Sequence, residues 1–152
     1  YELVKPNEEV LVMFSGSGVL PVVISKNSKA KHIVGIEINP HAHKYALENI
    51  KLNKCSNVEL INADVRKAMP KQKFDRVLMP LPMGAEHFLD LAINAVKKGG
   101  VIHFYDFLDE EDIPNAAIEK IKKHTKKYKI LNYTKCGQFS PKKYRVCVDF
   151  IV

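Results

Sequence analysis

The sequence lacks the signatures of several classes of protein. None of its apolar runs approaches the roughly 20 residues that span a bilayer, and the opening YELVKPNEEV is neither basic nor apolar enough for a signal peptide. Its three cysteines, Cys55, Cys136 and Cys147, are an odd number without C-x-x-C spacing, which disfavours a disulfide framework or a zinc site. At 152 residues, the chain is expected to form one soluble cytosolic domain with reduced thiols and no metal.

Arrangements typical of hydrolases and metal enzymes are missing as well. The sequence shows no Ser/His/Asp order and no carboxylate pair that would suit a hydrolase. His41 and His43 lie two residues apart and would point to different faces of a helix, so they make a poor metal pair. His103 lies within an apolar run, and we expect it to be a hydrogen-bonded core histidine.

Positive charge is concentrated at the carboxyl-terminal end of the chain. The net charge is +7, yet residues 1–111 carry 14 Lys/Arg and 14 Asp/Glu, whereas residues 112–152 carry 10 and 3. A basic lobe beside a neutral body is typical of a protein that binds a polyanion. A solvated helix face would show the same lysines, so charge alone leaves both interpretations open.

Short apolar runs alternate with helical periodicities along the chain. Five runs are mostly continuous, as in strands that are covered on both faces: Glu9–Phe14, His32–Ile38, Val58–Ala63, Phe74–Met79 and Gly100–Phe107. The helical stripes are Ala42, Tyr45, Ala46 and Ile50 after Pro40; Ala85, Phe88, Leu89, Ala92, Ala95 and Val96 before Gly99 and Gly100; and Ile113, Ala117, Ile121 and Tyr128. This alternation predicts a doubly wound, mostly parallel α/β sheet.

The last two strand-like runs follow a different rule. Residues Tyr128–Thr134 and Tyr144–Val152 are separated by KCGQFSPKK, which is too short for a crossover helix, so they should form an antiparallel hairpin. A seven-stranded sheet with such a hairpin is the Rossmann-like architecture of class I S-adenosylmethionine methyltransferases. The fold analogy therefore points to that cofactor class.

Three predicted strand ends carry residues suited to a nucleoside. Phe14-Ser15-Gly16-Ser17-Gly18 is a glycine loop before a helix, where backbone N–H groups can approach a ligand, although any tight strand-to-helix turn also favours glycine. Glu37 ends the second strand, where a carboxylate can accept hydrogen bonds from both ribose hydroxyls. Asp64 follows the third strand and can accept from an adenine amino group, cap the next helix, or do both.

In the stretch RVLMPLPMGAEHF, the fourth predicted strand is followed directly by a stiff loop. Pro80 and Pro82 have no N–H to donate to a sheet, and their fixed φ holds the loop in one shape. Rigid loops at the carboxyl ends of parallel strands are where open α/β sheets bind ligands. We expect this loop to lie beside the nucleoside pocket.

With these motifs in place, the sequence resembles the catalytic domain of the archaeal and eukaryotic tRNA (guanine-37-N1)-methyltransferases and their wybutosine-pathway relatives. The segments that carry the resemblance span the chain in the family's order: MFSGSG, IEINPHAHKYALENIKLNK, ADVRKAM, RVLMPLPMGAEHFLDLAI, GGVIHFYDF and SPKKYRVCVDF. The combination of INPHA, ENIKLNK and GGVIHFY is more specific than the glycine loop and acid that other methyltransferases share.

The resemblance implies a cofactor, a target and a set of site residues. S-adenosylmethionine would be bound by residues at the first three strand ends: Phe14, Ser15, Gly16, Gly18, Glu37, Ile38, Asp64 and Val65. The target base and the methyl group would meet at the catalytic loop formed by Pro80, Leu81 and Pro82. Phosphates of a tRNA anticodon region would be contacted by Lys122, Lys123, Lys126, Lys127, Lys142, Lys143 and Arg145.

The implied reaction is methyl transfer to N1 of guanosine 37 in tRNA, with C7 of 4-demethylwyosine as a further target of the archaeal subgroup. Two positions depart from the family: Val12 stands where an acidic residue is common, and Pro80 stands where the loop commonly begins with Asn. The family's tRNA-binding part and general base are expected to lie outside this chain. We expect a cytoplasmic monomer of archaeal type that binds neither a metal nor a membrane.

Three other functions fit parts of the same pattern. A wybutosine-pathway relative would transfer the aminocarboxypropyl group of the same cofactor from the same pocket. A non-catalytic tRNA-binding module would keep the fold without the chemistry. A dehydrogenase is disfavoured because Pro21 stands where a dinucleotide-binding loop needs its third glycine.

Overall fold

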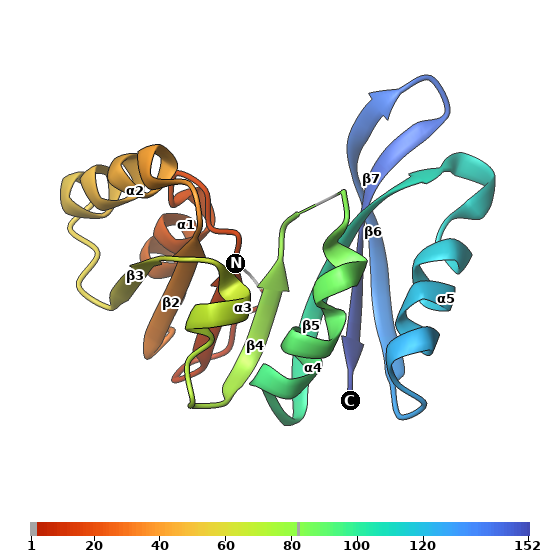
Figure 1. The fold of residues 1–152 in the computed structure, drawn as a ribbon, viewed down its shortest axis with the longest axis horizontal. Helices are drawn as coiled ribbons and strands as arrows, with labels where there is room; N and C mark the ends of the chain where they lie inside the picture. The colour runs from red at the N-terminus through yellow and green to blue at the C-terminus, as the bar shows by residue number, and fades with distance from the viewer. Residues whose placement is uncertain (1–2, 82) are drawn as a thin grey trace.

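The computed structural model describes residues 3–81 and 83–152, which form a seven-stranded mixed sheet with helices on both faces (Figure 1). The strand order is β3-β2-β1-β4-β5-β7-β6. Strands β1 to β5 run parallel to one another, and β7 lies antiparallel between β5 and β6. The predicted doubly wound fold with a carboxyl-terminal antiparallel hairpin is therefore confirmed.

The helices and strands alternate along the first five strands. The strands are β1 (Glu9–Met13), β2 (His32–Glu37), β3 (Val58–Asn62), β4 (Phe74–Met79), β5 (Val96–Asp109), β6 (Lys129–Ser140) and β7 (Lys143–Ile151). The α-helices are α1 (Val19–Asn27), α2 (Pro40–Leu52), α3 (Val65–Ala68), α4 (Leu89–Ala95) and α5 (Asn115–His124). Two short 3-10 helices are η1 (Ala85–Phe88) and η2 (Glu110–Asp112). None of the helices in the described residues is long and apolar enough to cross a membrane.

Two hydrophobic cores lie on opposite faces of the sheet. The larger one joins α4 and α5 to the sheet through buried residues such as Leu89, Ile121 and Phe104. The smaller one packs Ile24 of α1 against Val12 of β1 and neighbouring strand residues. Because successive strand residues point to opposite faces, the continuous apolar runs in the sequence fill both cores.

The parallel pairing brings four loops to one edge. The register aligns Met13 with Ile36 and Glu37 with Asn62, so β1, β2 and β3 end close together. Strand β4 pairs with β1 on the other side, with Val12 opposite Leu78. The loops after these strands therefore converge at the carboxyl edge of the sheet, the upper edge in Figure 1.

Strand β5 begins earlier than the sequence suggests. Gly99 and Gly100 were expected to end a helix, but α4 ends at Ala95 and Val96 already pairs with Phe74 of β4. The pairing then shifts register before Arg76 meets Val101. A Cβ atom at Gly100 would lie 2.7 Å from the Asp75 carbonyl oxygen, so this glycine permits a close backbone approach rather than a helix end.

The carboxyl-terminal hairpin is longer than the sequence suggests. KCGQFSPKK was expected to connect two strands, but most of it belongs to β6, and Pro141 and Lys142 alone join β6 to β7. The second half of β6 was not predicted because three irregularities in the β6–β7 register interrupt the alternation of side chains that marks a strand. The hairpin projects beyond the carboxyl edge of the sheet (Figure 1).

A buried polar network crosses β4, β5 and β7. Arg76 donates to both carboxylate oxygens of Glu8 at 2.8 and 3.0 Å and lies 2.6 Å from Nε2 of His103. Nδ1 of His103 lies 2.6 Å from Oδ1 of Asp149. The prediction that His103 is a hydrogen-bonded core histidine is confirmed, because His103 is only 7% exposed and both of its ring nitrogens are hydrogen-bonded.

Candidate functional site

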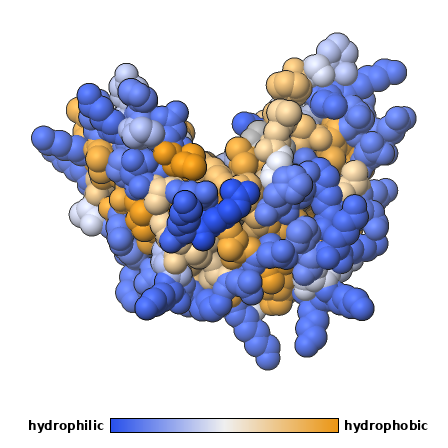
Figure 2. Space-filling model, in the orientation of Figure 1, coloured by the Kyte–Doolittle hydropathy of each residue, from blue (hydrophilic) through white to orange (hydrophobic). Residues whose placement is uncertain are grey.

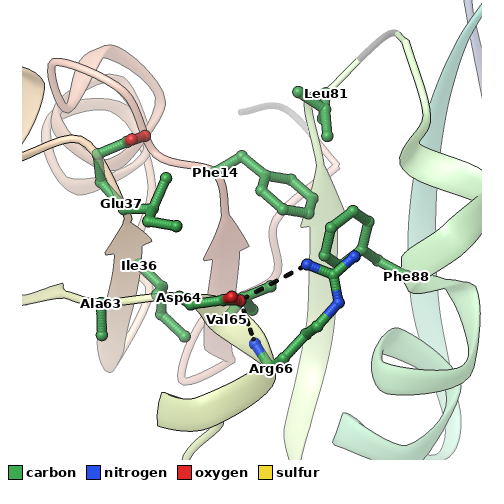
Figure 3. A pocket seen from close by; sticks show the side chains of 10 residues that line it. Phe14, Ile36, Glu37, Ala63, Asp64, Val65, Arg66, Leu81 and Phe88 are labelled. Carbon is green, nitrogen blue, oxygen red and sulfur yellow. Dashed lines mark hydrogen bonds and ion pairs between the residues drawn. The ribbon is translucent and has the colours of Figure 1, made fainter.

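A pocket of about 230 Å³ opens where the loops after β1, β2, β3 and β4 converge (Figure 3). Its walls are mostly apolar, with three charged side chains among them. The lining residues are Phe14, Ile36, Glu37, Ile38, Ala63, Asp64, Val65, Arg66, Leu81 and Phe88. An apolar pocket with a few converging polar groups is the usual form of a small-molecule site.

The loop after β1 turns sharply through residues with positive φ. Phe14, Gly16 and Gly18 have φ values of 57°, 57° and 82°. A Cβ atom at Gly18 would lie 3.0 Å from Cβ of Ala46, so glycine is needed there for both conformation and packing against α2. The space beside Gly16 is open, with no atom within 4 Å of the position that a Cβ would occupy, so a ligand can approach its backbone.

The carboxylate of Glu37 is fixed by backbone donors from two loops. The N–H of Gly16 donates to Oε2 at 2.8 Å, and the N–H of Asn39 donates to Oε1 at 2.7 Å. A carboxylate has about four acceptor sites, so roughly two remain for a ligand. Glu37 is half-buried at the pocket wall, which leaves this acceptor capacity available to a bound molecule.

Asp64 caps the short helix α3 on the other side of the pocket. Its Oδ1 accepts from the N–H of Arg66 at 2.9 Å, and the Arg66 guanidinium lies 3.8 Å from the same oxygen. The second carboxylate oxygen is absent from these interactions among the described residues, so it can accept from a ligand. The predicted helix cap is confirmed, whereas the predicted adenine contact stays a prediction.

The phenyl rings of Phe14 and Phe88 and the Arg66 guanidinium form the wall of the pocket that faces Glu37 (Figure 3). The rings of Phe14 and Phe88 meet edge to face with centroids 4.8 Å apart. The Arg66 guanidinium lies 4.0 Å from the Phe88 ring centroid, which is a cation–π distance. Leu81 closes this side, so the loop after β4 contributes to the pocket as the sequence indicated.

The structure brings most of the predicted cofactor residues together. Phe14, Glu37, Ile38, Asp64 and Val65 all line the pocket. Ser15, Gly16 and Gly18 shape the loop behind them, with Ser15 buried and its N–H bonded to the carbonyl of Ile36 at 2.9 Å.

Of the predicted catalytic loop, Leu81 lines the pocket and Pro80 follows the last residue of β4. Pro82 lies outside the described residues. The role of this loop at the target base therefore stays a prediction.

Sequence reasoning missed four lining residues. Ile36 and Ala63 flank acids that had been identified, and Arg66 and Phe88 come from helices on the face of the sheet. Phe88 could not be recognised from the sequence, because its place in an apolar stripe is typical of a core residue. Arg66 follows Asp64 in NADVRKAM, and this proximity to a candidate acid was the available signal.

The predicted phosphate-binding residues divide into two groups at opposite ends of the sheet. Lys143 pairs with Asp109 at the end of β5, so Lys142, Lys143 and Arg145 lie at the carboxyl edge, like the pocket. Lys129 pairs with Ile151 at the other end, next to Lys126 and Lys127. Lys122 and Lys123 occupy the last turn of α5, which leads to that remote end.

The cysteines and the buried histidine are not among the residues that line the pocket. All three cysteines are free thiols. Burial, together with repulsion from the Asp149 carboxylate, raises the pKa of the Cys147 thiol far above its ordinary value, so this thiol stays protonated. Its neighbour His103 has both ring nitrogens in hydrogen bonds, to Arg76 and to Asp149.

The pocket opens into a larger hollow. Figure 2 shows the α2 region and the β6–β7 hairpin as two projections with apolar residues exposed between them. The pocket is therefore continuous with a wider, partly apolar hollow at the carboxyl edge of the sheet.

Comparison with known proteins agrees with this geometry. Residues 1–132 match the family model described as the TRM5/TYW2 methyltransferase domain. A tRNA (guanine(37)-N(1))-methyltransferase, Trm5b of Pyrococcus abyssi, is 36% identical over 100% of this chain and 46% of its own length. A tRNA(Phe) (4-demethylwyosine(37)-C(7)) aminocarboxypropyltransferase of Methanocaldococcus jannaschii is 38% identical over 94% of this chain and 59% of its own length.

A solved structure shows the same fold. TYW2 of M. jannaschii, crystallised in complex with AdoMet, superposes with a TM-score of 0.89 at 35% identity, covering 98% of this chain and 71% of that chain. The present chain thus spans about half the length of the curated relatives that it matches. Sequence identity above 30%, a matching family model and a shared fold all lead to one conclusion: the chain belongs to the TRM5/TYW2 methyltransferase-domain family.

Proposed function

We propose that residues 1–152 form the catalytic domain of an S-adenosylmethionine-dependent tRNA methyltransferase that acts on guanosine 37. The observation that carries the proposal is the fixed carboxylate of Glu37, which lies in one pocket with Asp64. The P. abyssi relative is named for methyl transfer to N1 of guanosine 37, and the TYW2 structure was solved with AdoMet. A tRNA substrate favours action in the cytoplasm, and we propose that the domain acts there as a monomer.

The pocket residues fit the proposed cofactor. The remaining acceptor sites of Glu37 suit two ribose hydroxyls, and the free oxygen of Asp64 suits an adenine amino group. Ile38, which is 64% exposed, and the Phe14–Phe88 pair provide apolar surface for a purine and its ribose. The open space beside Gly16 lets the methionine part approach the loop backbone.

When bound, S-adenosylmethionine supplies a methyl group that is already activated for displacement. The domain must therefore hold the pocket in shape, exclude water and align the target base. Leu81 and the Phe14–Phe88 pair supply the apolar wall on the side where the base would enter. Removal of the base proton needs a general base, which we propose lies outside this chain.

Titration with S-adenosylmethionine in a calorimeter tests the proposal first. We expect one binding site per chain, with affinity lost on replacement of Asp64 by Ala, because this removes the acceptor at the adenine end. Loss of the helix cap costs about 1 kcal/mol, so the melting temperature must be measured in parallel. If the natural chain bound no S-adenosylmethionine, or if Asp64→Ala bound it with unchanged affinity, this cofactor site would be excluded.

A second function is favoured by one relative. The M. jannaschii aminocarboxypropyltransferase is 38% identical, and such a transfer would use the same pocket with a different carbon of the cofactor facing the base. Pro80 stands where the methyltransferase pattern commonly has Asn, which removes a side-chain hydrogen-bond donor and acceptor near the proposed base site. Mass spectrometry of nucleosides from tRNA treated with the complete protein separates the two, since the transferred groups differ in mass.

Salt dependence tests which basic group contacts the tRNA near its modification site. We expect the double change Lys142→Gln and Lys143→Gln to weaken binding of an anticodon stem-loop and to lower its salt slope by roughly one to two. The physical reason is that these lysines share the carboxyl edge with the pocket.

The matched control removes the same charge at the remote end, by Lys126→Gln and Lys127→Gln. This control should leave stem-loop binding nearly unchanged and weaken only the binding of full-length tRNA. Filter binding at several salt concentrations measures both variants. Equal losses from both pairs on the stem-loop would contradict the assignment of the hairpin as the local contact.

A further inference from the structure

We infer that the β6–β7 hairpin carries a stacking site for an unpaired nucleotide of the RNA substrate. The site is a separate hollow of about 280 Å³, lined by Phe107, Gly137, Gln138, Phe139 and Arg145. The inference deepens the proposed function and rests on it for the identity of the RNA as tRNA. The hollow itself is distinct from the pocket that holds Glu37 and Asp64.

The strand register builds this hollow. Arg145 of β7 pairs with Phe107 of β5 on one side and with Gly137 of β6 on the other, so the three residues form one row across the sheet. Gly137 has no side chain, and no atom lies within 4 Å of the position that its Cβ would occupy. The row therefore presents a phenyl ring and a guanidinium beside an open space.

The row faces away from α5. Asp106, the neighbour of Phe107, forms an ion pair with Lys120 of α5 at 2.7 Å. Because successive strand residues point to opposite faces, Phe107 and Arg145 lie on the other face of the sheet. Phe139 closes the hollow, with its ring centroid 4.4 Å from that of Phe107.

The exposure and charge of these side chains suit a nucleotide. Phe139 is 62% exposed, so a phenyl face is available to a planar base. Arg145 is exposed and has no acidic partner within 4 Å in the part of the chain that the structure describes. An aromatic face beside an unpaired arginine is the combination that binds unpaired bases and their phosphates, by stacking and by charge.

The hollow is within reach of the proposed reaction site. Phe104 of β5 pairs with Met79, the last residue of β4 before the Pro80 loop. Phe107 lies three residues further along β5, which corresponds to roughly 10 Å at the rise of a strand. A neighbour of the target nucleotide could therefore stack here once the target base has left its own stack.

A single tryptophan gives a direct test, because the natural chain has none. In Phe139→Trp, we expect a short unstructured RNA of mixed adenosine and cytidine to quench the fluorescence, whereas polyphosphate at equal charge should not. The matched control is Tyr133→Trp, which places the fluorophore at another exposed aromatic position of β6. Equal quenching by polyphosphate, or in the control, would overturn the stacking site.

Affinity measurements complete the test. Phe139→Ala is expected to weaken binding of the same RNA by roughly 5- to 100-fold, as for loss of one base–aromatic stack, with a melting temperature close to that of the natural chain. Arg145→Gln should weaken it as well and lower its salt slope. Unchanged affinity in Phe139→Ala would overturn the inference.

These measurements contain no S-adenosylmethionine, so they separate the two proposals. Quenching without cofactor binding in the calorimeter would exclude the methyltransferase function and keep the stacking site. Cofactor binding without quenching would exclude the stacking site alone.

Discussion

Replacement of Arg76 by Met is expected to lower the free energy of unfolding by about 3–5 kcal/mol, the usual cost of removing one partner from a buried ionic pair. Arg76 is only 3% exposed, and its guanidinium is hydrogen-bonded to Glu8 and to His103. Methionine fills a similar volume but cannot donate. The change therefore leaves the Glu8 carboxylate without its guanidinium partner.

The direction of the hydrogen bonds explains why the loss extends along the network. Arginine only donates, so Nε2 of His103 must accept from Arg76, and Nδ1–H must donate to Asp149. The guanidinium thus fixes the tautomer of His103 in which Nδ1 carries the proton and donates it to Asp149 in a hydrogen bond. Without Arg76, the ring nitrogen that faced it becomes an unsatisfied buried acceptor, which adds to the cost.

Urea unfolding followed by circular dichroism measures this effect. The matched control is Lys97→Met, which removes a cation from a more exposed cluster with Glu9 and Asp75 and should have a much smaller effect. Adding Glu8→Gln to Arg76→Met should recover part of the lost stability, because it removes the unpaired charge. An Arg76→Met midpoint equal to that of the natural chain would show that the network does not stabilise the fold.

The sequence predicted the parts of the fold that depend on continuous apolar runs and short connections. The runs EVLVMF, HIVGIEI and FDRVLM are buried on both faces, so their composition alone identified β1, β2 and β4. The lack of space for a helix between the last two strands predicted the antiparallel hairpin. These features are local in the sequence, which is why they could be recognised there.

Features that depend on register or on packing across the sheet were not predictable. The full length of β6 was missed because its irregular pairing disrupts the alternation that marks a strand. Phe88 lines the pocket because η1 packs beside Phe14, which is a tertiary contact that the sequence does not show. The basic residues formed one group in sequence, yet α5 and the hairpin carry them to opposite ends of the sheet, which is a property of topology.

The carboxylate of Glu37 connects local structure to the proposed function, and its removal should have a large effect on cofactor binding. Glu37→Gln is expected to weaken S-adenosylmethionine binding by roughly 100-fold or more, since two hydrogen bonds to a charged acceptor are lost or weakened. In the natural chain, both oxygens already accept from N–H groups, of Gly16 and Asn39. A glutamine amide has only one oxygen, so its NH₂ group would face one of these donors and displace the loop.

Calorimetry with Glu48→Gln as the control separates this local effect from a general change in charge. Glu48 lies exposed on α2, so its replacement should leave the affinity unchanged. Glu48→Gln should melt at the temperature of the natural chain, because its side chain is exposed, whereas the melting temperature of Glu37→Gln must be measured in parallel because the change disturbs two backbone hydrogen bonds. If Glu37→Gln bound the cofactor as tightly as the natural chain does, neither the Glu37 carboxylate nor the loop position that it fixes would contribute to binding, and the ribose would have to be bound elsewhere.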